Sequence, residues 1–259
     1  MLISCKKSIL LVLTIVIEIM SLVFITGGGK RLGSHLVLEF AKKGWDVVFS
    51  YFESQNNSEK ILQIILRQNI KAKSYKLDVR NHNELEATFK EIVNEFGVPD
   101  VLINNAGVFP ERKAIENISL DLWEDTMNIN LRSAFLCSQI FKKYAKKGSR
   151  IINISSIGGS EVWKQRIPYN VSKAGLNQLT KVLARELAPN ISVNAVCPGI
   201  ISFEETGENE KYLPEIRKIP MARYGIADDI FDAVYFFATC SRYITGQVLN
   251  VDGGYHDAR

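Results

Sequence analysis

The chain has 259 residues, of which 46% are hydrophobic and 23% charged, and its formal net charge is +4. This composition supports a full globular core and excludes disordered, collagen-like and disulfide-stapled miniprotein classes. The small net charge excludes a dedicated nucleic-acid-binding protein, because such proteins carry dense basic surface. The few cysteines and histidines are scattered through the sequence. We therefore expect a cytoplasmic protein with reduced thiols and no metal site.

The first nineteen residues form an apolar extension that the sequence leaves open to three interpretations. Residues 9–19 are interrupted by Glu18 and are too short to span a bilayer, which takes about 20 residues. No small-residue cleavage site follows them, as a secretory signal would require. We favour translation from Met20, with an interfacial helix as the second interpretation and a cleaved signal as the third. We do not expect a membrane partner.

The remainder, residues 20–259, is predicted to be a single domain in which apolar runs alternate with amphipathic stretches. Continuous apolar runs are typical of parallel strands that are buried on both faces. Their alternation with helices indicates βαβ units, and so an α/β, doubly wound Rossmann fold with a mostly parallel seven-stranded sheet. The irregular segment 200–222 is a candidate lid. Strands are expected at 22–26, 46–51, 71–76, 100–103, 150–155, 191–196 and 247–251, and helices at 31–43, 55–68, 82–96, 119–147, 168–188 and 227–239.

A glycine-rich turn connects the first predicted strand to the first predicted helix. Its sequence is TGGGKRLG, at residues 26–33. Glycine lets the backbone approach a pyrophosphate closely, and the following helix directs free N–H groups and its positive dipole end at the phosphate. A glycine-rich turn without a ligand is the alternative. The expected dinucleotide contacts in this turn are Thr26, Gly27, Lys30, Arg31, Leu32 and Gly33.

The end of the second predicted strand favours NADP(H), with NAD(H) as the alternative. Sites that prefer NAD place an acid there to bind the ribose 2′-hydroxyl. This chain has Tyr51 at that position, and Lys30 adds positive charge on the adjacent turn. Glu53 lies two residues further on and could turn inward, which would favour NAD(H).

A tyrosine, a lysine and a serine form the candidate catalytic group. Tyr169 and Lys173 are four residues apart in a predicted helix, so both project from one face. A nearby ammonium lowers the pKa of a phenol. We therefore expect Tyr169 to act as the general acid in ketone reduction, or as the base in alcohol oxidation. Ser156 follows the fifth predicted strand and can hydrogen-bond a carbonyl oxygen.

These motifs resemble those of the short-chain dehydrogenase/reductase superfamily over about residues 20–256. The likeness includes Asn104-Asn105-Ala106-Gly107 after the fourth predicted strand and Pro198-Gly199 after the sixth. Arg31 stands where the family usually has glycine, a variant similar to that of pteridine and dihydropteridine reductases. The resemblance implies that Asn130 holds a water linking Lys173 to solvent. It also implies cofactor contacts from Asp78, Val79, Asn105, Ala106, Gly107, Tyr169, Lys173, Pro198, Gly199 and Ile201.

For Asp78, a helix cap is the alternative role. The resemblance implies an NAD(P)-dependent oxidoreductase that reduces a ketone to a secondary alcohol. Our preferred substrate is a 3-oxoacyl thioester on acyl carrier protein or coenzyme A.

A cluster of cations could dock an acidic carrier. Alternatively, these cations are there because positive charge is favourable at a helix C-terminus. The cluster comprises Lys142, Lys143, Lys146, Lys147 and Arg150, and the candidates to line the substrate pocket are Phe109, Trp163, Phe203 and Tyr212.

Three other functions remain open at this stage. Arg31 and the run Ser202-Phe203-Glu204-Glu205 resemble pteridine reductases, but those enzymes commonly carry an aspartate where this chain has Ser156. A membrane-associated enzyme acting on a lipid or sugar alcohol is a further alternative. A nucleotide-sensing regulator without catalysis is disfavoured by the intact catalytic group. The resemblance also implies a homotetramer or homodimer that assembles through the long helices after the fourth and fifth strands.

Overall fold

The computed structural model of the protein describes residues 21–203 and 216–256. Our expectations for residues 1–19, for Tyr212 and for most of the candidate lid lie outside the described residues. The strands begin and end within two residues of their predicted positions. They are β1 (Leu22–Ile25), β2 (Asp46–Tyr51), β3 (Ala72–Lys76), β4 (Val101–Asn104), β5 (Arg150–Ile154), β6 (Ser192–Pro198) and β7 (Val248–Val251).

The described strands form one seven-stranded sheet in the order β3-β2-β1-β4-β5-β6-β7. Every adjacent pair is parallel, so the sheet is wholly rather than mostly parallel. The chain winds outward from β1 in one direction to β3, and in the other direction from β4 to β7. The doubly wound prediction is therefore confirmed. In such sheets ligands bind beyond the carboxyl ends of the strands at the point of reversal, here between β1 and β4.

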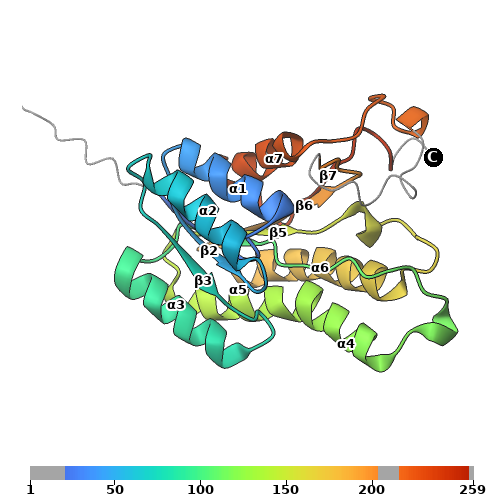
Figure 1. The fold of residues 1–259 in the computed structure, drawn as a ribbon, viewed down its shortest axis with the longest axis horizontal. Helices are drawn as coiled ribbons and strands as arrows, with labels where there is room; N and C mark the ends of the chain where they lie inside the picture. Colours follow the sequence, from blue (N-terminus) through green and yellow to red (C-terminus); the bar gives the residue numbers. More distant parts are fainter. Residues whose placement is uncertain (1–20, 204–215, 257–259) are drawn as a thin grey trace, which may run out of the picture.

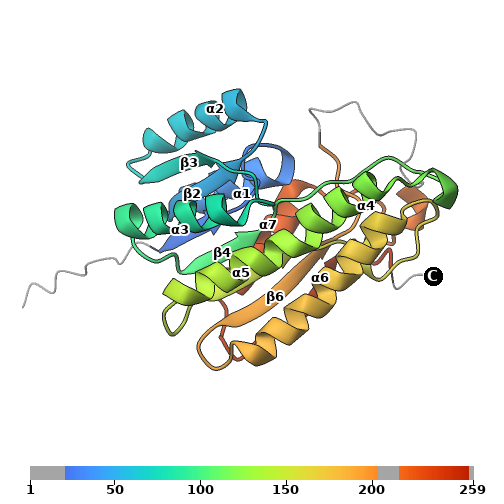
Figure 2. The same cartoon turned by 90° about the horizontal axis from the view of Figure 1, so that it is seen from below.

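Helices cover both faces of the sheet (Figures 1 and 2). On one face lie α1 (Arg31–Lys42), α2 (Gln55–Leu66) and α7 (Ala227–Thr239). On the other face lie α3 (His82–Phe96), α4 (Leu120–Met127), α5 (Ser133–Tyr144) and α6 (Ile167–Glu186). No helix within the described residues is both long enough and apolar enough to cross a membrane.

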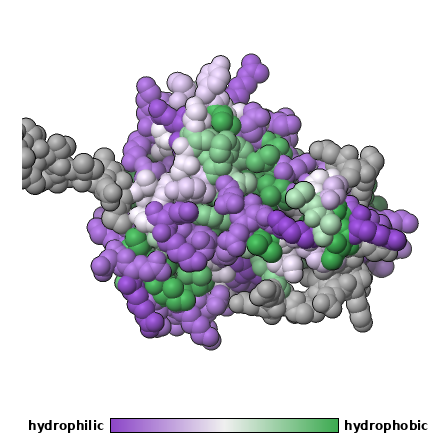
Figure 3. Space-filling model, turned by 90° about the horizontal axis from the view of Figure 1, so that it is seen from above, coloured by the Kyte–Doolittle hydropathy of each residue, from purple (hydrophilic) through white to green (hydrophobic). Residues whose placement is uncertain are grey.

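Two hydrophobic cores, one on each face of the sheet, follow from the alternation of side chains along the strands. In β1, Val23 and Ile25 are buried in the core beneath α1, while Phe24 is buried in the core on the opposite face. There the Phe24 ring meets Phe89 of α3 edge to face, with centroids 5.1 Å apart. The outer surface over α1 and α7 is mainly hydrophilic, with separate apolar patches (Figure 3). Because the strands are buried on both faces of the sheet, their sequences are continuous apolar runs.

The predicted helix 119–147 is interrupted in the structure. A π-helical turn, Asn128–Arg132, separates α4 from α5. Such widened turns inside helices frequently mark functional sites. Sequence periodicity missed it, because a single extra residue per turn changes the apolar pattern little. The turn contains the predicted catalytic residue Asn130.

The start of α3 settles the alternative role of Asp78. The N-cap of this helix is Asn81, whose side-chain oxygen accepts hydrogen bonds from the backbone N–H groups of Asn83 and Glu84. Asp78 instead accepts from Arg80. The helix-cap alternative for Asp78 was therefore wrong, since asparagine three residues later satisfies the free N–H groups.

Candidate active site

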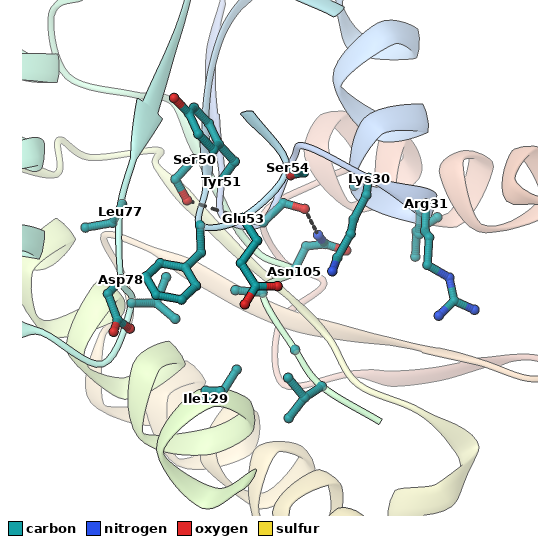
Figure 4. A pocket seen from close by; sticks show the side chains of 18 of the residues that line it. Lys30, Arg31, Ser50, Tyr51, Glu53, Ser54, Leu77, Asp78, Asn105 and Ile129 are labelled. Atoms are coloured by element: carbon teal, nitrogen blue, oxygen red, sulfur yellow. Dashed lines mark hydrogen bonds between the residues drawn. The ribbon is translucent and has the colours of Figure 1, made fainter. Parts of the chain in front are cut away.

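A cavity of about 380 Å³ lies at the carboxyl ends of the first four strands (Figure 4). Sequence reasoning missed part of its lining, including Phe52, Arg80 and Ile129. Arg80 lies two residues after Asp78, so its position just after the third strand could have indicated that it lines the cavity. Most of the predicted cofactor residues line this cavity, namely Gly27, Lys30, Arg31, Leu32, Gly33, Tyr51, Asp78, Val79, Asn105, Ala106 and Gly107.

Thr26 connects the glycine-rich turn to the loop that follows β4. Its buried hydroxyl accepts hydrogen bonds from the backbone N–H groups of Asn105 and Ala106, both at 3.1 Å. The Asn105 amide donates in return to the carbonyl oxygens of Thr26 and Gly27, at 3.0 and 2.9 Å. A Cβ atom at Gly33 would lie 2.1 Å from the Gly27 oxygen. The turn is thus drawn tight against the helix start, leaving the close backbone approach that a pyrophosphate needs.

The two cations of the turn point in different directions. Lys30 extends into the cavity beside Asn105, whereas Arg31 points away from Tyr51 and Asp78 (Figure 4). Arg31 has φ 51°, in the left-handed region that usually favours glycine. Its guanidinium lies over the ring of Phe203, 5.0 Å from the centroid. Lys30 therefore faces the cavity, and Arg31 faces the segment that follows β6.

The end of β2 contributes both residues that bear on cofactor choice. Tyr51 occupies the last position of the strand and lines the cavity. Glu53 also lines the cavity, and its side chain is directed inward (Figure 4). The inward glutamate considered from the sequence is therefore present, although it comes from the loop rather than from the strand end.

An arginine pairs with Asp78 at the end of the cavity that follows β3. Arg80 Nη2 lies 2.8 Å from Asp78 Oδ2, and Arg80 Nη1 lies 2.9 Å from Asp125 Oδ1. The hydrogen bonds from Arg80 lower the pKa of Asp78. Asp78 is thus held as a carboxylate whose position is set before any ligand arrives.

The candidate catalytic residues meet at the carboxyl end of β5. Ser156, just after that strand, hydrogen-bonds Tyr169 of α6. The Lys173 ammonium lies 6.0 Å from the centroid of the Tyr169 ring and donates to the carbonyl oxygen of Ile154 at 2.9 Å. A Cβ atom at Gly158 would lie only 3.0 Å from the Tyr169 ring, so glycine there permits this packing.

The predicted lowering of the Tyr169 pKa was wrong. Burial raises the pKa of Tyr169, and this outweighs the hydrogen bond from Ser156 and the positive charges of Arg166 and Arg31, which lower it. Burial lowers the pKa of Lys173 to about 8. Both changes have one cause, since removing a group from water disfavours its charged form.

Asn130 joins the π-helical turn to the catalytic helix. Its side-chain oxygen accepts from the Val108 N–H at 2.8 Å, and its amide donates to the Val108 oxygen and to Ser172 Oγ. A Cβ atom built on Gly107 would lie 3.3 Å from Asn130 Oδ1 and 3.7 Å from Lys173 Nζ. Asn130 and Lys173 therefore face the same corner of the site.

Three predicted cofactor residues lie at the end of β6 or just after it, outside the lining of this cavity. The Gly199 N–H donates to the Val251 oxygen at 2.9 Å, and Ile201 forms an isolated parallel bridge with Gly225. Pro198 is the last residue of β6. These contacts place the segment beside β7, with Phe203 reaching back to Arg31.

The predicted cation cluster lies at the far end of α5 from the site. Because α5 returns antiparallel to the strands, its C-terminus reaches the amino edge of the sheet (Figure 2). Two of the lysines form ion pairs, Lys143 with Glu86 and Lys146 with Asp100. Within one chain, the cluster does not border the candidate active site.

Two potential metal ligands one turn apart on α1 meet a third from α7 at the surface. Ligand atoms of His35, Glu39 and Asp228 lie within 4.8 Å of one another. His35 is hydrogen-bonded to Asp228 at 3.0 Å, and Glu39 is paired with Lys42. These pairings account for the proximity without an ion.

Comparisons with known proteins agree with this geometry. A family sequence model described as "Enoyl-(Acyl carrier protein) reductase" matches residues 29–256. The 3-oxoacyl-[acyl-carrier-protein] reductase of Synechocystis sp. is 34% identical over 235 residues, which cover 89% of this chain and 94% of that protein. The chain belongs to the short-chain dehydrogenase/reductase family. It is therefore an oxidoreductase.

Solved structures in the short-chain dehydrogenase/reductase family show the same architecture. A member from Serratia marcescens superposes with a TM-score of 0.86 at 31% identity, covering 91% of this chain and 98% of that one. A blue fluorescent protein from a metagenomic library, solved in complex with NADPH, gives a TM-score of 0.85 at 31% identity, covering 91% of this chain and 97% of that one.

Proposed function

We propose that this enzyme uses NADPH to reduce a 3-oxoacyl thioester to the corresponding 3-hydroxyacyl thioester. The observation that carries the proposal is the meeting of Ser156, Tyr169 and Lys173 at the carboxyl end of β5, next to the dinucleotide cavity. A proton donor beside a hydroxyl donor is what carbonyl reduction requires. The curated relative from Synechocystis, a 3-oxoacyl-[acyl-carrier-protein] reductase, supports the substrate class.

The cofactor is NADP(H). Lys30 extends into the cavity, and the strand end carries Tyr51 instead of an acid. The glycine-rich turn and its tight packing fit a pyrophosphate. The neighbour solved with NADPH is in accord with this choice. When bound, the nicotinamide supplies the hydride that reaches the carbonyl carbon.

The chain itself positions the carbonyl and supplies the proton. Ser156 donates a hydrogen bond to the substrate oxygen, and Tyr169 transfers its hydroxyl proton to that oxygen as the carbon is reduced. The raised pKa of Tyr169 keeps the proton on the phenol at neutral pH. Lys173 is held under the Tyr169 ring by its bond to Ile154, and Asn130 keeps the adjacent backbone in place. The proton lost by Tyr169 is replaced from solvent along this polar edge.

The carrier of the acyl group can be acyl carrier protein or coenzyme A. The cation cluster at the end of α5 is remote from the site within one chain. A family homo-oligomer assembled through α5 and α6 is part of the proposal. Exposed apolar residues on these helices support it, namely Phe135, Val171 and Val182.

Pteridine reduction is the second candidate, because Arg31 extends toward Phe203 on the substrate side. The deciding experiment follows NADPH oxidation with acetoacetyl thioester and with dihydrobiopterin in parallel. We expect turnover of the thioester. Turnover of the pterin alone would contradict the proposal and would make Arg31 and Phe203 substrate-binding residues.

Tyr169→Phe tests the proposed proton donor. We expect at least a ~100-fold loss of kcat, because general-acid catalysis contributes about 10²–10⁴-fold. The binding of NADPH, followed by its fluorescence, should remain near that of the unsubstituted enzyme. Substantial remaining turnover would remove Tyr169 from the role of proton donor.

A further inference from the structure

A buried arginine lies beside the tyrosine that the proposed function makes the proton donor. Arg166 immediately precedes α6 and is only 9% exposed. Gln165 before it has φ 64°, a left-handed conformation that is uncommon for a residue with a side chain. Strain of this kind persists where the surrounding structure requires it. Here it turns the chain so that the Arg166 side chain enters the protein.

The Arg166 guanidinium joins the start of α6 to the loop that follows β4. It lies over the ring of Phe109, 4.0 Å from the centroid, a distance at which cation–π attraction is strong. It also donates a hydrogen bond to the carbonyl oxygen of Pro110. The neighbouring backbone reinforces the link, since the Lys113 N–H donates to the Gln165 oxygen at 3.0 Å.

The ring held by Arg166 packs directly on the proposed proton donor. Phe109 meets Tyr169 edge to face, with centroids 4.6 Å apart and planes at 79°. Trp163 stacks on Tyr169, with centroids 6.0 Å apart and planes at 9°, and it also meets Phe109 edge to face, with centroids 6.2 Å apart. Tyr169 thus belongs to a cluster of three mutually contacting aromatic rings, and Arg166 fixes one of the other two.

Arg166 also adds positive charge near the Tyr169 hydroxyl. The polar and charged groups that face this tyrosine are Ser156, Cys197, Lys173, Arg31 and Arg166. Burial raises the pKa of Tyr169, while the hydrogen bond from Ser156 and the charges of Arg166 and Arg31 oppose that increase.

We propose that Arg166 is a positioning residue for the proton transfer: it fixes Phe109 against the Tyr169 ring and keeps positive charge beside the Tyr169 hydroxyl. The proposal rests on the proposed function of Tyr169. It assigns to Arg166 two separable effects, one through the shape of the aromatic packing and one through charge.

The test compares Arg166→Met, Arg166→Lys and Phe109→Leu, with kcat and KM measured across pH. Reduction needs Tyr169 protonated, so its rate falls as pH rises through the Tyr169 pKa. Loss of the charge in Arg166→Met should move this alkaline limb to higher pH and lower kcat at neutral pH about tenfold. Arg166→Lys should restore the limb but only part of kcat, because a lysine lacks the planar fork.

Phe109→Leu removes the aromatic packing and leaves the charge. We expect kcat to fall several-fold while the alkaline limb stays in place; this half-exposed residue can change without threatening the fold. Lys164→Met is the matched control, since it removes an exposed cation two residues from Arg166 and should change neither quantity. NADPH fluorescence and circular dichroism check that each variant folds.

Two results would overturn the proposal. One is an unmoved alkaline limb in a folded Arg166→Met enzyme, which would reduce Arg166 to a structural role. The other is an unchanged kcat in Phe109→Leu. This result would contradict the proposal even if Arg166→Met does not fold. Tyr169→Phe separates these failures from that of the proposed function, because retained turnover there removes the proton donor itself.

Discussion

At the residue scale, the buried ammonium of Lys173 has the largest effect on the electrostatics of the site. Lys173 is 5% exposed, and its hydrogen bond to Ile154 replaces only part of the water that it loses. Burial therefore lowers the pKa of Lys173 from 10.5 to about 8. Between these values the unfolded chain binds a proton that the folded chain does not, so stability rises with pH across that window. Below pH 8 the full cost of burying the charge is present.

Lys173→Met should consequently stabilise the fold while it abolishes most turnover. The burial cost at neutral pH is on the order of 3 kcal/mol, and the unpaired Ile154 oxygen in the variant offsets about 1 kcal/mol of the gain. Urea unfolding at neutral pH measures the change. Lys181→Met, an exposed site on the same helix, is the control and should be neutral. A variant less stable than the unsubstituted enzyme would show that the ammonium is well solvated.

Cofactor choice also belongs to single residues. Tyr51→Asp places a carboxylate where a 2′-phosphate would lie, so KM for NADPH should rise about tenfold or more and KM for NADH should fall. Glu53→Gln is the companion variant, because Glu53 already directs a carboxylate into the cavity. If Glu53→Gln alone moves the preference further toward NADPH, then Glu53 rather than Tyr51 determines the preference between NADPH and NADH.

At the scale of elements, the π-helical turn positions the side-chain amide of Asn130. A regular helix through 128–132 would carry Asn130 past Val108 and Ser172, which it now binds with its entire side-chain amide. Through these bonds the turn ties the loop after β4 to α6. The loop carries Phe109, and α6 carries Tyr169 and Lys173. The extra residue of the turn thus aligns two elements that are remote in sequence.

Asn130→Leu should loosen that alignment. The variant removes the partner of the buried Ser172 hydroxyl and of the part-buried backbone groups of Val108, at a cost of about 2 kcal/mol in the free energy of unfolding, and kcat should fall more than NADPH affinity. Asn128→Leu is the control on the same turn, since no described hydrogen bond involves the Asn128 side chain. Equal stability of the two variants would contradict the role given to the amide.

At the scale of the whole molecule, the sheet divides the chain into two cores that share one binding edge. The glycine-rich turn rests on the core beneath α1, and the proposed catalytic residues rest on the opposite side with α5 and α6. The reversal between β1 and β4 brings both sets to the same edge. A dinucleotide bound there would contact elements from both halves of the sheet.

NADPH should therefore stabilise the fold globally. At a concentration 100 times its Kd, we expect the free energy of unfolding to rise by about 2.7 kcal/mol, with a smaller rise from NADH at equal concentration. Lys30→Met should reduce the NADPH effect, whereas Lys60→Met, an exposed lysine on α2, should leave it unchanged. Urea unfolding with and without each nucleotide provides the measurement. Equal stabilisation by both nucleotides would argue against NADP(H) preference.

The sequence by itself determined the element order, the strand positions and most of the residues that line the cavity. Periodicity carries this information, because strands buried on both faces must be apolar throughout and turns at their ends must be glycine-rich or polar. The identity of Ser156, Tyr169 and Lys173 followed from spacing together with the family resemblance.

Tertiary structure alone decided the electrostatics and the packing. Whether Lys173 lowers the Tyr169 pKa depends on burial, which the sequence spacing does not report. The π-helical turn, the pairing of Arg80 with Asp125 and the seating of Arg166 on Phe109 each join segments that are distant in sequence. Such contacts arise only when the sheet order brings those segments together, so no local pattern could have indicated them.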